Sequence, residues 1–106
     1  MARWIVEDGR VLGGVALRLG DDDVVREHGH IGYGVRPGDR GRGVATWALA
    51  QILDEARRHG MSRALAVCEI DNIASARTLE RMGGMLTASE HTGVRRYWFD
   101  LDAAGI

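Results

Sequence analysis

A glycine-rich stretch that carries three arginines could bind a phosphate group. Residues 35–46 read Val-Arg-Pro-Gly-Asp-Arg-Gly-Arg-Gly-Val-Ala-Thr and join an apolar segment to a run with helical periodicity. The first N–H groups of that helix would have no partner inside it, and the positive end of the helix dipole would favour an anion there. Gly41 and Gly43 would let a bulky diphosphate approach the backbone. The neighbouring guanidinium groups, which add attraction, belong to Arg36, Arg40 and Arg42.

The spacing of this stretch excludes two well-known phosphate-binding motifs. The dinucleotide pattern G-x-G-x-x-G needs a third glycine where Thr46 stands, and the P-loop needs a lysine, whereas all 14 basic residues here are arginine. Residues 40–45, Arg-Gly-Arg-Gly-Val-Ala, resemble the Arg/Gln-x-x-Gly-x-Gly/Ala signature of the GNAT superfamily of N-acetyltransferases. In that superfamily the turn holds the pyrophosphate of acetyl-CoA. The resemblance therefore implies cofactor contacts from Arg40, Gly41, Arg42, Gly43, Val44, Ala45 and Thr46.

A second segment strengthens the resemblance. Residues 71–84 look like the later GNAT motif, in which an Asn opens a helix after a strand, a small residue follows three positions on, and a Gly closes the helix. The sequence is most similar to a bacterial group of GNAT acetyltransferases that share five short motifs along most of the chain. In this sequence those motifs are His30 to Pro37, Arg40 to Thr46, Cys68 to Ser75, Gly83-Gly84 and Arg96-Tyr97-Trp98.

The composition is that of one small globular domain spanning residues 1–106. The sequence is 45% hydrophobic and 27% charged, and it has no apolar run near the ~18 residues that would predict a membrane span. No leader peptide is expected from the first residues. Cys68 is the only cysteine, so we expect a reducing, cytoplasmic setting. The net charge of −1 argues against a nucleic-acid partner.

The periodicity of the chain predicts the elements that position these motifs. Glu7-Asp8-Gly9 predicts a tight hairpin, Asp21-Asp22-Asp23 a polar loop, and Asn72 or Asp71 a helix cap before a short helix that Gly83 ends. His28, His30, Gly32 and Gly34 would share one face of the third strand. The predicted strands are Arg3–Val6, Val11–Leu19, His28–Val35, Ala64–Ile70, Met85–Glu90 and Val94–Leu101, and the long helix is Gly43–His59.

This order of elements indicates an α/β (α+β) fold similar to the GNAT acyl-CoA acyltransferase core, with a mixed central sheet and two main helices. The resemblance begins at the equivalent of the second strand of the family. Family members usually carry one strand and two helices before it, and those helices wall the acceptor site. We therefore expect either a fragment or a short form whose missing wall comes from a partner. A homodimer is the expected arrangement.

Acetyl transfer to an amine needs a polarised carbonyl and a base. The resemblance implies that the main chain of the central strand, at Tyr33, Gly34 and Val35, runs beside the pantetheine arm and polarises the carbonyl. For the base we expect His30, since many relatives carry a Glu there and an imidazole suits proton removal near neutral pH. A histidine with purely structural hydrogen bonds is the alternative. Further candidates for the base are Glu27, His28 and Glu69.

The residue that would protonate the leaving thiolate differs from the family pattern. Many GNAT enzymes place a Tyr seven residues after the Asn, where this chain has Leu79, which we expect in the core. Tyr97 is a candidate substitute, although its position favours a packed strand aromatic, and the proton could also come from water or from the product ammonium. Asn72 would either bind the pantetheine arm or only cap its helix, and Ser75 would lie beside the cofactor. Cys68 is expected to be a buried, inert thiol.

These observations predict an acetyl-CoA-dependent N-acetyltransferase that acetylates a primary amine of a small molecule or a protein by direct attack. No metal is expected. The second interpretation is a non-catalytic acyl-CoA-binding or regulatory module, because the usual tyrosine and the upstream helices are absent. A third is a general phosphate-ligand domain, which would bind nucleotides as well as CoA.

Overall fold

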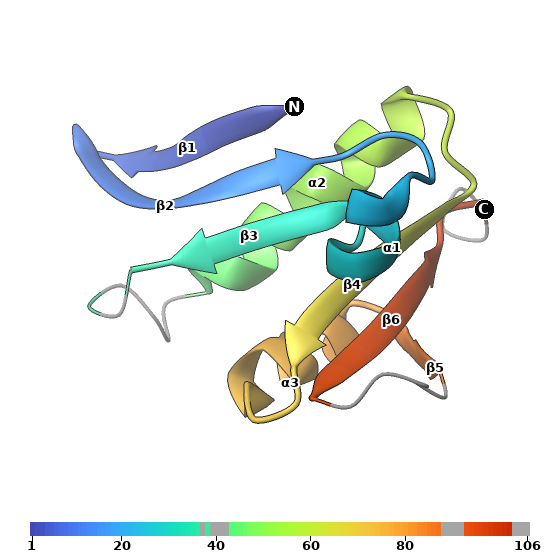
Figure 1. The fold of residues 1–106 in the computed structure, drawn as a ribbon. Coiled ribbons are helices and arrows are strands. Elements are labelled where there is room, and N and C mark those ends of the chain that lie inside the picture. Colours follow the sequence, from blue (N-terminus) through green and yellow to red (C-terminus); the bar gives the residue numbers. More distant parts are fainter. Residues whose placement is uncertain (37, 39–42, 88–92, 103–106) are drawn as a thin grey trace.

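A mixed sheet of six strands forms the centre of the molecule (Figure 1). The computed structural model describes residues 1–36, 38, 43–87 and 93–102. The strand order is β1-β2-β3-β4-β6-β5, with β3 and β4 parallel and the other neighbours antiparallel. The strands are β1 (Ala2–Glu7), β2 (Arg10–Leu17), β3 (Ile31–Val35), β4 (Arg63–Glu69), β5 (Met85–Thr87) and β6 (Val94–Asp100).

Three helices flank this sheet in the described part of the chain: α1 (Asp23–His28), α2 (Val44–Arg58) and α3 (Ile73–Arg81). In Figure 1, α2 crosses behind β2 and β3, whereas α1 lies on the opposite side, in front of the junction of β3 and β4. One face of the half-sheet β1–β3 is therefore covered by a long helix. On the other face of that half-sheet, α1 at the start of β3 is the only helix among the described residues.

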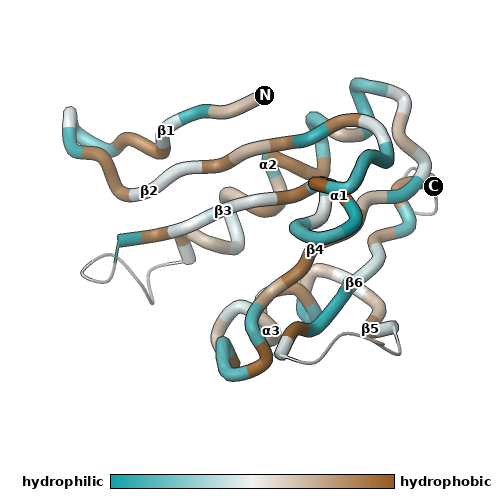
Figure 2. The backbone as a smooth tube through the Cα atoms, in the orientation of Figure 1, coloured by the Kyte–Doolittle hydropathy of each residue, from teal (hydrophilic) through white to brown (hydrophobic). Residues whose placement is uncertain are grey.

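The main core lies between the sheet and the two longer helices. Leu49 and Ile52 of α2, Leu79 of α3, and Tyr97 of β6 are all almost inaccessible to solvent. A smaller cluster joins Ile5 and Leu12 to the same side of α2. Figure 2 shows hydrophobic residues along much of β4, as expected for a strand in the middle of a covered sheet. Burying these side chains supplies most of the stabilisation of the fold.

The segment before β3 differs from the prediction. Instead of a polar loop followed by a strand from His28, residues 23–28 form α1, and β3 begins only at Ile31. The side chain of Asp22 caps this helix by accepting the N–H of Val25 at 3.1 Å, and Gly29 ends it at a φ of 83°. The predicted strand face that included His28 was therefore wrong, because capping by Asp22 and the left-handed turn at Gly29 favour a helix.

The other predicted elements are confirmed within a few residues. Asp8 and Gly9 both have positive φ and form the tight hairpin between β1 and β2. The second strand ends at Leu17 rather than Leu19. Gly43 and His59 flank α2 as its caps, and Asn72 caps α3. In the last hairpin, β5 ends at Thr87 within the described residues. The last three residues of the predicted strand, 88–90, and residues 91 and 92 of the predicted connection lie outside the described residues.

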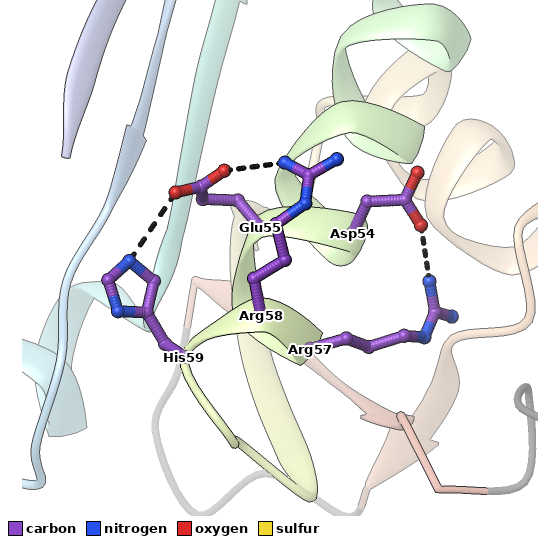
Figure 3. Close-up of polar contacts among 5 residues, drawn as sticks. All are labelled: Asp54, Glu55, Arg57, Arg58 and His59. Atoms are coloured by element: carbon purple, nitrogen blue, oxygen red, sulfur yellow. Dashed lines mark hydrogen bonds and ion pairs between the residues drawn. The ribbon is translucent and has the colours of Figure 1, made fainter.

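Acidic and basic side chains near the C-terminal end of α2 contact one another (Figure 3). Arg57 lies 2.8 Å from Asp54, and Glu55 contacts both Arg58 at 2.9 Å and His59 at 3.4 Å. Basic side chains in a last turn also complement the helix dipole.

Candidate functional site

The sheet opens between its two parallel strands. Ile31 of β3 pairs with Ala66 of β4, and no further residue pair joins these strands in the described chain. Gly29 adds one isolated bridge to Ala66 at the same end. Beyond this junction β3 and β4 diverge (Figure 1). The main chain of Tyr33 and Gly34 therefore lies beside a gap, where a regular sheet would place a neighbouring strand about 4.8 Å away.

Two hollows meet at this gap. The first, which we call the α2 hollow, has a volume of about 460 Å³ and is lined by the end of β3, the first turn of α2 and one side of α3. The second, the α1 hollow, has a volume of about 450 Å³ and lies between α1, β3 and β4. Both are lined by Tyr33, Asn72 and Ser75. Each falls within the size range of small-molecule sites.

The first turn of α2 offers the α2 hollow a row of backbone donors. Gly43, the N-cap, is left-handed at a φ of 77° and has no side chain to accept hydrogen bonds from the helix. The first turn contains no acidic residue. Val44, Ala45 and Thr46 line the hollow with Gly43. The sequence analysis assigned these four residues to an anion site. Arg40, Gly41 and Arg42, predicted for the same site, lie outside the described residues.

The opposite wall of the α2 hollow comes from α3. The side chain of Asn72 caps this helix by accepting the N–H of Ser75 at 3.2 Å, so the capping role considered for Asn72 is present. Arg77 and Arg81, one helical turn apart, line the same hollow. Sequence reasoning missed these two arginines. Their spacing of four residues behind a cap at Asn72 could have identified them as one charged helix face.

Tyr33 reaches the boundary between the two hollows with its hydroxyl group. Its oxygen lies 3.0 Å from the hydroxyl of Ser75, so the two side chains bridge the gap between β3 and α3. Burial raises the pKa of Tyr33, an effect that the hydrogen bond to Ser75 opposes and the nearby Cys68 increases. The phenol is therefore protonated at neutral pH. The sequence assigned Tyr33 only a main-chain role.

Acidic and imidazole side chains gather at the α1 hollow. Glu27 and His28 come from α1, with His28 Nε2 3.9 Å from Glu27 Oε2, and Glu69 comes from the end of β4. The side chains of Glu27 and His28 are mostly exposed, at 77% and 59%. Arg18 lines the same hollow and donates to the carbonyl of Gly29 at 3.2 Å. Potential bases and a cation thus surround one cavity.

His30, the first candidate for the base, is buried with 8% exposure. Its Nδ1 accepts the backbone N–H of Leu65 at 2.9 Å, and its Nε2 lies 3.0 Å from the carbonyl oxygen of Gly20. Because Nδ1 accepts, the proton resides on Nε2, which donates to Gly20. Both ring nitrogens are used within the fold. This is the structural arrangement that the sequence analysis left open as the alternative.

Tyr97, the candidate acid, lies in the core away from both hollows. It has no exposed surface, and its hydroxyl donates to Glu80 Oε2. Burial, and then the contact with Glu80, raise the pKa of Tyr97 to about 12. Leu79 is buried, as expected. Cys68 is buried at the side of the α1 hollow, and burial raises the pKa of its thiol, which agrees with an inert cysteine.

The described residues were also considered for membrane-spanning helices and for clusters of metal ligands. None of the helices in the described ranges is long and apolar enough to cross a membrane. Over the same residues, no group of three or more His, Cys, Asp or Glu side chains converges on a point where a metal ion could bind.

Comparison with known proteins agrees with this geometry. The model of the acetyltransferase (GNAT) family matches residues 2–84. The uncharacterized N-acetyltransferase YjdG of Bacillus subtilis (strain 168) is 34% identical over 89 residues, which are 78% of this chain and 51% of YjdG. The chain belongs to the GNAT acetyltransferase family, and the family predicted from the two sequence motifs is confirmed.

Solved structures show the same fold. The structure of yncA from Salmonella typhimurium with its cofactor acetyl-CoA has a TM-score of 0.73 and 27% identity, over 91% of this chain and 61% of that one. The GNAT domain of S. lividans PAT has a TM-score of 0.76 and 21% identity, over 93% of this chain and 59% of that one. The GNAT fold is thus confirmed. The chain spans about half the length of YjdG and about three fifths of these structures.

Proposed function

We propose that this chain binds acetyl-CoA across the two hollows and transfers its acetyl group to a primary amine. The observation that carries the proposal is the junction of a helix N-terminus, a gap between parallel strands, and a carboxylate-bearing cavity. A ligand with an anionic group at one end and a reactive group at the other would match this order, with its anionic group at the helix N-terminus and its reactive group at the cavity. The acetyl-CoA bound in the yncA structure supports the choice of ligand.

The α2 hollow suits the phosphate groups of the donor substrate. Its diphosphate would accept hydrogen bonds from the first N–H groups of α2, at Val44 and Ala45, where the helix dipole also favours it. Arg77 and Arg81 line the other wall and would attract further phosphate oxygens. Arg40 and Arg42, which lie outside the described residues, would add further positive charge. The pantetheine arm would then follow the main chain of Tyr33, Gly34 and Val35 toward the α1 hollow.

The α1 hollow suits the acceptor amine. The Glu27–His28 pair at its mouth would remove the proton from the attacking ammonium, in place of His30, whose ring nitrogens are both engaged. The free amine would form the new C–N bond as the C–S bond breaks. A backbone N–H of β3 that faces the gap would polarise the thioester carbonyl. Saturating turnover should fall roughly 10²-fold or more in Glu27→Gln if this carboxylate is the base.

We also propose that the protein acts in the cytoplasm as a homodimer. The supporting observation for the dimer is the uncovered face of β1–β3, which exposes Trp4 at 76% beside Gly14. A second copy would cover this face and complete the wall of the acceptor cavity.

A non-catalytic acyl-CoA-binding module is the second candidate. It is favoured by the buried Leu79 at the position where many relatives carry a tyrosine, and by the engaged ring of His30. A binder would retain affinity for acetyl-CoA and release no thiol with any amine acceptor.

Calorimetric titration with acetyl-CoA tests the proposal most directly. In Ala45→Glu the added carboxylate would stabilise the first turn of α2, which has no acidic residue, but would repel the diphosphate. The matched control is Ala45→Gln, which has the same size without the charge. We expect micromolar affinity in the parent, a moderate loss in the control and a loss of at least tenfold more in Ala45→Glu. Equal affinities in the two variants would contradict the proposed phosphate site.

A thiol-release assay then separates the two candidates. The parent is incubated with acetyl-CoA and a panel of primary amines, including a peptide with a free N-terminus. Thiol release that depends on both the amine and Glu27 supports the enzyme. Binding without amine-dependent thiol release across the panel supports the binding module.

A further inference from the structure

We propose that the hydroxyl group of Tyr33 is the proton donor to the CoA sulfur when the acetyl group leaves. This inference rests on the proposed function, because it assumes that acetyl-CoA occupies the groove that the α2 hollow and the α1 hollow form together. It assigns to Tyr33 a side-chain role in the reaction in addition to its place on β3. Ser75 would be the positioning residue that holds the phenol in place.

The position of Tyr33 along β3 supports this role. Gly34 and Val35 line only the α2 hollow, and Ile31 and Gly32 line only the α1 hollow. Tyr33 lines both. Since a strand advances about 3.3 Å per residue, a substrate that passes from one hollow to the other has to pass the tyrosine at close range. The bond that breaks in acetyl transfer lies at this passage, between the anchored cofactor arm and the acceptor.

The hydrogen bond to Ser75 fixes where the hydroxyl points. Tyr33 Oη and Ser75 Oγ are 3.0 Å apart, and Ser75 lies on the side of α3 that lines both hollows. Ser75 can accept from or donate to the phenol because both groups are hydroxyls. The phenol can thus give its proton to a sulfur in the groove while Ser75 donates to the phenol oxygen.

The other candidate donors are less suited. Tyr97 is buried in the core and bonded to Glu80, and position 79 holds an apolar leucine. Thr78 lines the α2 hollow, but its hydroxyl donates to the carbonyl of Ala74 at 3.0 Å. Cys68 lines the α1 hollow with a thiol, which is a weak donor. Among the described residues that line the groove, Tyr33 alone offers a phenol.

The proton balance of the step is complete. The amine nitrogen bonds to the carbonyl carbon, the C–S bond breaks, and its electron pair goes to sulfur. Sulfur takes the proton of Tyr33, which gives the free thiol. The proton that the amine lost to the base returns through solvent and Ser75 to the phenolate. Amine and acetyl thioester thus become amide and thiol. Because the raised pKa of Tyr33 keeps the phenol protonated, the donor form is present before each turnover.

The test is the pKa of the CoA thiol when it is bound to the protein. CoA, which carries a free thiol, is bound to the parent or to Tyr33→Phe, and the ionisation of this thiol is followed by the ultraviolet absorbance of the thiolate. Complexes with desulfo-CoA, which has no thiol, serve as blanks for the absorbance of Cys68 and the tyrosines. A donated hydrogen bond stabilises the thiolate, so its loss should raise the pKa of the bound thiol by about 1 to 2 pH units. Ser75→Ala should raise it by less. The matched control is Tyr97→Phe, which removes a phenol hydroxyl outside the groove.

Each outcome has a distinct meaning. An increased thiol pKa in Tyr33→Phe, absent from Tyr97→Phe, supports the inference. The same thiol pKa in the parent, Tyr33→Phe and Ser75→Ala, with CoA bound to all three, overturns the role of Tyr33 but leaves the proposed function intact. Failure of the parent to bind either CoA or acetyl-CoA overturns the proposed function itself. Calorimetry on the same samples makes this distinction.

Discussion

His30 joins the two halves of the sheet at a single position. Its main-chain N–H donates to the carbonyl of Leu65 at 2.8 Å, and its Nδ1 accepts the N–H of Leu65 at 2.9 Å. Its Nε2 meets the carbonyl of Gly20. The side chain thus satisfies the buried N–H of Leu65 and also bonds the carbonyl of Gly20. Loss of such partners leaves polar groups unpaired in a dry environment, which is costly.

From this arrangement we predict that His30→Ala lowers the free energy of unfolding by about 2 kcal/mol or more. The variant is compared with the parent by urea unfolding followed by circular dichroism. His59→Ala, which changes an exposed imidazole at the end of α2, is the control and should change stability by less than about 1 kcal/mol. An unchanged midpoint in His30→Ala would contradict the structural role.

Tyr97 provides a prediction in alkaline solution. Its pKa rises from 10.0 to about 12 in the folded protein, so the phenol is stabilised in its protonated form. For a raised folded pKa, the stabilisation is complete below the unfolded value and is lost as the pH rises through the folded value. We expect the free energy of unfolding to fall by up to about 2 kcal/mol between about pH 9 and about pH 12. Urea unfolding across this range should show a smaller fall in Tyr97→Phe.

The sequence predicted some residue roles and not others for a physical reason. Gly43 could be placed at the start of α2 because helix N-termini have local sequence requirements. Whether the ring of His30 is available as a base depends on its hydrogen bonds to Leu65 and Gly20, which are 35 and 10 residues away in the chain. Such partners become visible only when strands are placed. The hydroxyl of Tyr33 was missed for the same reason, since Ser75 is 42 residues away.

At the scale of elements, α1 is the segment where prediction was wrong. Residues 28–35 alternate in a way that favours a strand, and the three aspartates before them favour a turn. The same aspartates, however, can open a helix: Asp22 caps it and Asp23 lies in its first turn. The six-residue helix that results carries Glu27 and His28 to the α1 hollow. A short helix with weak apolar periodicity is hard to distinguish from a loop by sequence.

The cap of α1 can be tested directly. Asp22→Ala removes the hydrogen bond to Val25 N–H and should destabilise the helix by about 1 kcal/mol. Hydrogen exchange should show faster exchange of the α1 amides, with little change in α2 or β4. Asp21→Ala, one residue before the cap, is the control. Equal exchange rates in the two variants would contradict the capping role of Asp22.

At the scale of the whole molecule, the uncovered face of β1–β3 is the main feature that needs an explanation. The ring of Trp4 lies over Gly14, and Gly32 and Ala16 follow on the same face. Their lack of bulk makes this face flat and leaves room for another surface to approach closely. An exposed tryptophan beside small residues is a frequent feature of protein interfaces.

If a second copy covers this face, Trp4→Arg should convert the dimer into a monomer. Sedimentation velocity over a range of protein concentrations measures this change. Trp47→Arg is the matched control, because Trp47 is also exposed, at 55%, but lies on α2 at the other side of the sheet. A parent chain that is monomeric at all concentrations would contradict the proposed homodimer.

The overall fold was more accessible to prediction than the arrangement of the site. The order of strands and the two long helices follow from apolar periodicity, from the Asp8-Gly9 hairpin and from the caps at Gly43 and Asn72, all of which are local features. The divergence of β3 and β4 depends instead on packing between segments far apart in the chain. The sequence could therefore indicate the family and the residues at the start of α2 that line the α2 hollow, but not which side chains meet where the two hollows join.

The single pairing between Ile31 and Ala66 implies that the angle between β3 and β4 is set at one point. Strand β3 extends about 13 Å beyond this point, so a change of about 5° in the angle would move its far end by about 1 Å. Gly29 lies at this point, where a Cβ atom would come within 2.7 Å of the carbonyl oxygen of Leu65. A substitution there would change the angle between the two strands, and with it the width of the gap between them, from a position outside the α2 hollow.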